Sequence, residues 1–168
     1  MKKSNDKLLK LCYASTFAAL IFCATMIHIG IGFNGGYIHL GDAVIYLAAS
    51  LLPAPYAVSA AAVGAGLADI AAGAPAWVLA TVLIKAASAL FFTSKKSTIL
   101  CPRNYIALFT GALLCVGGYY ISEVLIYSCG FVIPLASIPF NLIQTVASAV
   151  IYLSMSVILD KASIKKHI

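Results

Sequence analysis

The chain has 168 residues, of which 62% are hydrophobic and 10% are charged, and its mean hydropathy is +1.02. A soluble globular protein needs more polar surface than this composition provides, so the sequence predicts an integral membrane protein. At roughly 20 to 25 residues per span, the length allows about six transmembrane helices in a single domain, residues 1–168. It excludes a separate soluble domain.

The net charge of +6 indicates topology rather than a nucleic-acid partner, because the basic residues gather between apolar segments. One group precedes the first apolar run, one lies in a single loop and one closes the chain: Lys2, Lys3, Lys7 and Lys10; Lys95, Lys96 and Arg103; Lys161, Lys165 and Lys166. An even number of spans between the groups places all of them in the cytoplasm, as the positive-inside rule requires. The five cysteines have no metal-ligand spacing, so neither a metal site nor a disulfide framework is expected, and we expect no cofactor.

The first predicted helix covers about residues 8–30. Its apolar run has no small-residue cleavage site, so we interpret it as a retained helix rather than a signal peptide. Ala14 and Ala18 lie one turn apart on one face, and small residues at this spacing let another helix approach closely in a membrane. Two interpretations stay open: the face packs inside the protein, or it docks a second protein.

A glycine-rich segment, residues 31–41, precedes a short second helix over residues 42–52, which Pro53 and Pro55 end. About a dozen residues rise only some 18 Å and cannot cross the roughly 30 Å hydrocarbon core. The helix is therefore expected to begin below the outer surface, with the preceding segment covering a pocket. Asp42 opens this helix, either as a capping residue or as an acid that holds the inner hinge of the covering segment.

The third helix, about residues 56–72, contains Gly64 and Gly66 for close packing and Asp69 near its outer end. The fourth, about residues 77–93, starts at Trp77, which suits an interfacial aromatic. Lys85 lies about 12 Å deeper and is an intramembrane cation that needs a partner. Asp69 on the neighbouring helix is the predicted partner. Whether this pair is structural or contacts a substrate stays open.

The last two helices are expected at about residues 105–127 and 139–160, the second with Pro139 in its first turn. The outer part of the fifth helix carries Tyr119, Tyr120 and Glu123. Asn141 and Gln144 share a face near the start of the sixth, so both amides are expected to face the bundle interior.

These helices bring most of the polar side chains outside the tails to the outer half of the bundle: Tyr37, His39, Asp42, Asp69, Trp77, Tyr119, Tyr120, Glu123, Asn141 and Gln144. The pattern predicts a binding site that opens outward, although each residue alone also has an ordinary role as a membrane anchor or as helix packing. Three acids against one lysine favour a neutral or cationic ring compound. Tyr37 and His39 are the expected direct contacts.

No phosphate-binding loop is present in the sequence, and no second half repeats the first. A binding site without a motor indicates a subunit of a larger transporter. The alternatives are a free-standing facilitator and, less favoured, a membrane enzyme that uses His39 with Asp42 or Glu123 as acid and base.

Four stretches resemble the substrate-binding S components of energy-coupling factor (ECF) vitamin transporters, in the branch of riboflavin, hydroxymethylpyrimidine and pyridoxine carriers. They are Gly36 to Val44, Gly64 to Asp69, Ile84-Lys85 and Pro139 to Gln144. The resemblance implies a six-transmembrane-helix bundle in a bacterial cytoplasmic membrane, with both termini cytoplasmic and an outer site covered by the segment between the first two helices. It also implies a transmembrane coupling protein and two ATPase subunits as partners, with Ala14 and Ala18 as the contact to the coupling protein.

Overall fold

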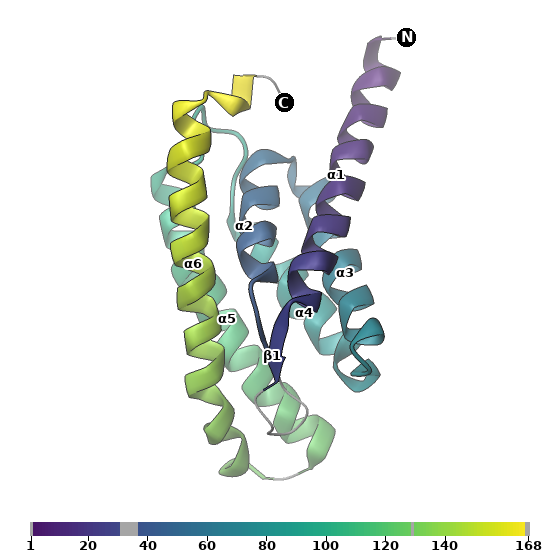
Figure 1. The fold of residues 1–168 in the computed structure, drawn as a ribbon, viewed down its shortest axis with the longest axis vertical. Helices are drawn as coiled ribbons and strands as arrows, with labels where there is room; N and C mark the ends of the chain where they lie inside the picture. Colours follow the sequence, from purple (N-terminus) through teal and green to yellow (C-terminus); the bar gives the residue numbers. More distant parts are fainter. Residues whose placement is uncertain (1, 31–36, 129, 167–168) are drawn as a thin grey trace.

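The computed structural model describes residues 2–30, 37–128 and 130–166 of the chain. These residues form six α-helices, two short strands and three 3₁₀ turns (Figure 1). In chain order the elements are α1 (Lys2–Met26), β1 (His28–Gly30), β2 (Tyr37–His39), α2 (Gly41–Leu51), α3 (Ala54–Ala71), η1 (Pro75–Trp77), α4 (Val78–Phe91), α5 (Pro102–Tyr127), η2 (Ile133–Ser137), α6 (Ile138–Lys161) and η3 (Ile164–Lys166). Residues 31–36 of the predicted covering segment lie outside the described residues.

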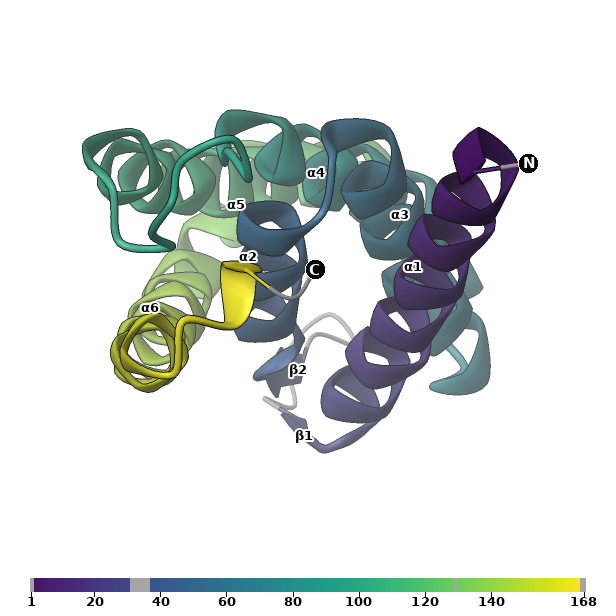
Figure 2. The same ribbon diagram turned by 90° about the horizontal axis from the view of Figure 1, so that it is seen from above.

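The helices form one bundle in which α2 has the central place. Seen from above, α3, α4 and α5 stand in a row, α1 and α6 flank it, and α2 lies on the inner side between α1 and α6 (Figure 2). Most of α2 is buried, including Asp42, Tyr46 and Ser50. α1 begins and α6 ends at the same end of the bundle (Figure 1). The side of the membrane that this end faces stays a prediction.

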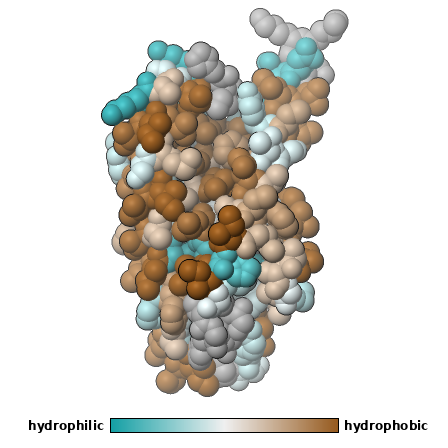
Figure 3. Space-filling view, in the orientation of Figure 1, coloured by the Kyte–Doolittle hydropathy of each residue, from teal (hydrophilic) through white to brown (hydrophobic). Residues whose placement is uncertain are grey.

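Among the described residues, four helices are long and apolar enough to cross a membrane: Asn5–Met26, Ala54–Ala71, Pro102–Tyr127 and Ile133–Lys161. Two further apolar helices, Gly41–Leu51 and Pro75–Phe91, are shorter. Hydrophobic residues cover most of the face in Figure 3, whereas hydrophilic residues gather where α1 begins and α6 ends, and in a patch across the middle. The chain is therefore an all-α, multi-pass membrane protein, apart from its short ribbon. Six spans stay a prediction.

Prolines mark three helix starts. Pro53 is the N-cap of α3, Pro102 begins α5, and Pro139 lies in the first turn of α6. Proline is tolerated there because the N–H groups of a first turn have no partner within the helix. The predicted break after the second helix and the proline in the first turn of the sixth are both confirmed.

The predicted end of the first helix is wrong. α1 ends at Met26, and β1 then pairs with β2 as an antiparallel ribbon in which His28 lies opposite His39 and Gly30 opposite Tyr37. Three residues are too few for strand alternation to be told from the end of an apolar helix. The ribbon fixes the position of β2 immediately before α2.

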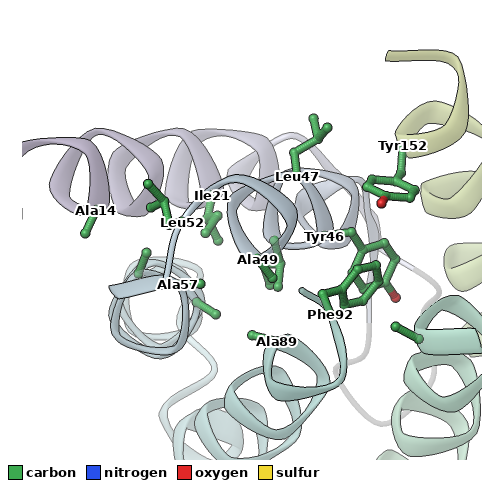
Figure 4. Packing of buried hydrophobic residues seen from close by; sticks show 14 of the residues in the cluster. Ala14, Ile21, Tyr46, Leu47, Ala49, Leu52, Ala57, Ala89, Phe92 and Tyr152 are labelled. Carbon is green, nitrogen blue, oxygen red and sulfur yellow. The ribbon is translucent and has the colours of Figure 1, made fainter. Parts of the chain in front are cut away.

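The hydrophobic core surrounds α2. Tyr46 of α2 stacks on Phe92 with ring centroids 4.9 Å apart, and Tyr152 of α6 meets both rings edge-on (Figure 4). The Tyr152 hydroxyl lies 2.9 Å from Ser50 Oγ, which satisfies the polar end of this ring. The three aromatic rings therefore join α2 to α6 and to the end of α4.

Close packing of α1 on α3 depends on Gly64. A Cβ atom at this position would lie 2.5 Å from the Ala18 carbonyl oxygen and 2.9 Å from Ile21 Cβ. Ala14 is buried in the core cluster, and Ala18 packs against that cluster. The structure thus gives the alanine face an internal packing role, and the predicted contact of Ala14 and Ala18 with a coupling protein stays a prediction.

The variant Gly64→Ala should be less stable than the wild type by about 1–3 kcal/mol, because its methyl group forces α1 away from α3. Thermal unfolding in detergent measures this loss. Gly117→Ala is the matched control, since a Cβ atom on Gly117 meets nothing within 4 Å and alanine favours the helix. Equal melting temperatures for the two variants would contradict the packing argument.

Candidate functional site

A cavity of about 50 Å³ lies in the half of the bundle remote from the start of α1. Its walls come from β2 and from the ends of α3, α4, α5 and α6 that lie in this half. The lining residues are Tyr37, Ile38, His39, Asp69, Trp77, Thr81, Tyr119, Glu123, Ser137, Phe140, Asn141 and Gln144. The structure thus brings together all the residues of the predicted site except Asp42, Lys85 and Tyr120.

Asp42 and Lys85 form a buried ion pair beside the cavity wall. Lys85 Nζ lies 2.7 Å from Asp42 Oδ1 and 3.0 Å from Oδ2, and each side chain is 2% exposed. Gln144 Nε2 also donates to Asp42 Oδ2 at 3.0 Å. A charge at this depth is costly unless it has such partners, so the pair fixes α2 relative to α4 and α6.

The predicted pairing of Asp69 with Lys85 is wrong. α2 lies inside the bundle and contacts α4, which brings Asp42 rather than Asp69 to the lysine. Asp69 instead accepts a hydrogen bond from the Tyr37 hydroxyl. The capping interpretation of Asp42 is also wrong, because the N-cap of α2 is Leu40 and no side-chain hydrogen bond caps this helix.

Hydrogen bonds fasten β2 to helices on two sides. The Tyr37 hydroxyl donates to Asp69 Oδ1 on α3, and the His39 backbone N–H donates to Gln144 Oε1 on α6 at 3.2 Å. His39 Nδ1 accepts from the Gly41 N–H at 3.1 Å, which fixes the imidazole at the start of α2. β2 is therefore a wall of the cavity, and Gln144 links that wall to Asp42.

Flat aromatic surfaces form another wall. The Trp77 ring centroid lies 5.8 Å from that of Tyr119 and 6.0 Å from that of Tyr127. Tyr119 is held by a 3.1 Å hydrogen bond to Thr81 and lies beneath Lys85 Nζ, which is 5.0 Å from its ring centroid. Trp77 is only 8% exposed, so it is a cavity wall rather than the interfacial anchor that its position predicts.

Sequence reasoning missed four lining residues: Ile38, Thr81, Ser137 and Phe140. Thr81 precedes Lys85 by four residues and Phe140 precedes Gln144 by four, so helical spacing from the predicted residues could have found both. Ser137 lies in a 3₁₀ turn and gives no such signal.

Tyr120, which the prediction grouped with the others, does not line the cavity. It donates to the Phe131 carbonyl oxygen at 2.7 Å. Consecutive helical residues point about 100° apart, and in α5 Tyr119 lines the cavity while Tyr120 bonds to the chain outside the lining.

The arrangement suits binding more than chemistry. Within the described part of the chain, no three histidine, cysteine or acidic side chains gather where they could hold a metal ion. Asp69 and Glu123 are buried acids that line the same cavity as the aromatic rings, and Asn141 and Gln144 add amides. Such a wall can stack a planar ring and orient it by a few hydrogen bonds.

Comparison with known proteins identifies the family of the chain. Residues 5–161 match the model of the family described as "ECF-type riboflavin transporter, S component". A comparison with curated proteins returned no significant match. The family match covers nearly the whole chain and includes every residue of the cavity wall and of the buried ion pair. The chain therefore belongs to the family of ECF-type riboflavin transporter S components.

Proposed function

We propose that this chain captures a small heteroaromatic vitamin or vitamin precursor from the outer side of a bacterial cytoplasmic membrane and delivers it inward. Its family consists of transporter S components rather than enzymes, and S components are the vitamin-binding subunits of ECF transporters. The observation that carries the proposal is the cavity in which the rings of Trp77 and Tyr119 meet the carboxyl groups of Asp69 and Glu123.

The charge of the cavity wall favours a neutral or cationic ring. Asp69 and Glu123 belong to the lining, which includes neither lysine nor arginine among the described residues. Lys85 is close, but Asp42 already balances its charge. A phosphorylated form of a vitamin would bring an uncompensated anion against two acids, so the free vitamin is the proposed substrate.

The size of the cavity favours a single ring. Its 50 Å³ is well below the roughly 300–1,000 Å³ of pockets that hold drug-sized ligands. A pyridoxine-type or hydroxymethylpyrimidine-type ring therefore requires less displacement of the walls than the three fused rings of riboflavin. Within the substrate class, we propose the one-ring compounds.

β2 forms a wall of the cavity that two hydrogen bonds hold in place. The Tyr37 to Asp69 and His39 to Gln144 hydrogen bonds close this wall on α3 and α6. A ring that contacts Tyr37 and Asp69 replaces the first of these bonds with its own polar contacts. Binding thus exchanges a hydrogen bond within the protein for one to the substrate, which gives selectivity for rings with a suitably placed donor.

Delivery is proposed to depend on a transmembrane coupling protein and two ATPase subunits, the partners of ECF S components. The lysine groups support an orientation with the start of α1 and the end of α6 in the cytoplasm. Ala14 and Ala18 remain the proposed contact to the coupling protein. This contact would use the part of their helix face that α3 does not cover. A free-standing facilitator would instead transport its substrate in vesicles that contain no ATPase.

A binding panel tests the proposed function. The purified protein in detergent is titrated with pyridoxine, pyridoxal phosphate, hydroxymethylpyrimidine, thiamin and riboflavin, and heat and melting temperature are measured. We expect one unphosphorylated one-ring compound to bind and to raise the melting temperature, and pyridoxal phosphate to have no effect. Binding of riboflavin alone would contradict the size argument, and stabilisation by none of these compounds would contradict the proposed substrate class.

A further inference from the structure

A second and larger cavity lies at the opposite end of the bundle from the proposed vitamin site. Its volume is about 530 Å³, and its lining consists of Lys10, Leu51, Leu52, Pro53, Ser94, Lys95, Lys96, Ser97, Lys165 and Lys166. We call it the basic cleft. Three separate segments supply its lysines: α1, the loop after α4, and η3 after α6 (Figures 1 and 2).

The positive charge of the basic cleft is not balanced within the described part of the chain. None of its five lysines lies within ion-pair distance of a described carboxylate, whereas Lys85 and Asp42 do pair. Asp160, at the end of α6, already accepts hydrogen bonds from the N–H groups of Ile99 and Leu100, at 2.7 and 3.0 Å. Like charges brought this close repel one another, so the cleft is suited to an anion.

Lys165 holds the wall of the cleft in place. Its ammonium group donates to the carbonyl oxygens of Ser94, Lys96 and Thr98, at 3.4, 3.0 and 3.2 Å. Asn104 fixes the start of the same loop through the N–H and carbonyl of Thr93. The fixed loop therefore presents Lys95 and Lys96 to the cleft beside Lys10 and Lys166.

The cleft and the adjoining turn of α1 also carry apolar side chains. Leu51, Leu52 and Pro53 contribute the apolar part of the lining. On α1, the half-buried Lys10 stands between the exposed side chains of Leu9 and Leu11. A ligand that fits both surfaces carries an anionic group for the lysines and an apolar part for the leucines. This combination favours a phospholipid over an acidic protein segment.

We propose that the basic cleft binds a phosphate group, supplied by the headgroup of an anionic phospholipid. Lys10 and Lys166 reach the phosphate from opposite sides of the cleft, and Lys95 and Lys96 reach it from the loop. Ammonium groups bind phosphate as point charges, which tolerates different headgroups. The site is independent of the vitamin cavity, so the proposal holds whichever substrate the protein carries.

Native mass spectrometry of the full-length protein with phosphatidylglycerol and phosphatidylcholine in equal amounts tests this site. One double variant, Lys10→Gln with Lys166→Gln, removes two lysines of the cleft. The matched control, Lys7→Gln with Lys161→Gln, removes two exposed lysines outside it from the same helix α1 and the same end of the chain. We expect the wild type and the control to retain phosphatidylglycerol preferentially, and the cleft variant to retain about tenfold less.

Inorganic phosphate is the second arm and distinguishes a lipid headgroup from the free anion. If millimolar phosphate raises the melting temperature of the wild type and the control but not of the cleft variant, and the wild type does not prefer phosphatidylglycerol, the phosphate site is supported with free phosphate as its ligand. Equal retention of both lipids by the wild type, or equal lipid retention by the cleft and control variants, would overturn the headgroup proposal. Loss of assembly with the coupling protein in the cleft variant alone, without change in lipid or phosphate binding, would assign the cleft to an acidic protein segment instead.

Discussion

Replacing Lys85 by methionine should destabilise the protein by about 3–5 kcal/mol, the usual loss when one member of a buried ion pair is removed. The variant leaves the Asp42 carboxylate buried, with Gln144 Nε2 as its remaining side-chain hydrogen-bond donor among the described residues. Methionine is about as long as the aliphatic part of the lysine side chain, so the loss of stability reflects the missing charge more than a missing volume. Thermal and denaturant unfolding in detergent measure it.

The double variant Asp42→Asn with Lys85→Met separates charge from packing. It removes both charges and keeps the amide of Gln144 next to a polar side chain, so most of the lost stability should return. Lys7→Met is a control for the substitution itself, because Lys7 is exposed on α1 and lies outside this network and outside both cavities. A Lys85→Met variant as stable as the wild type would show that the ion pair does not hold α2 in place.

Replacing Trp77 by alanine should weaken vitamin binding by about 10- to 100-fold while the bundle remains folded. The indole is nearly buried in the cavity wall and packs against Tyr119 and Tyr127. Removing it takes away a stacking surface worth on the order of 1–3 kcal/mol. Isothermal titration with the ligand that the binding panel selects gives the change in affinity.

The same residue supplies an optical signal, because Trp77 is the single tryptophan of the chain. A stacked heteroaromatic ligand should change its fluorescence in the wild type, with the same midpoint as the heat signal. Trp77→Phe is the matched control and should lose less affinity, since phenylalanine keeps an aromatic face. Unchanged affinity in Trp77→Ala would exclude this wall from the site.

The sequence predicted the helices well where a physical boundary marks them. Pro53 and Pro55 predict the break between the second and third helices. α2 begins one residue before the predicted start, residue 42, and ends one residue before the predicted end, residue 52. β1 and β2 were not predicted, because three residues that pair across a turn carry no local signature. Their pairing depends on where α1 and α2 place the connecting chain.

For the site, the depth of each side chain in the bundle could be predicted from the sequence, but the partner of the buried lysine could not. Counting residues from each helix end places Asp69, Tyr119 and Gln144 at similar depth, and they do line one cavity. The partner of Lys85 depends on which helix lies inside the bundle. The order of the helices along the chain favoured Asp69, because α3 directly precedes α4. The structure places α2 there, and Asp42 with it.

The central position of α2 has a mechanical consequence. Its first turn carries Asp42, which Gln144 links to the wall of the vitamin cavity, and its last residue, Leu51, lines the basic cleft. An 11-residue helix is about 16 Å long, so one short rigid segment reaches from the ion pair beside the vitamin cavity to the basic cleft. Any displacement of α2 along its own axis therefore changes the shape of both cavities at once.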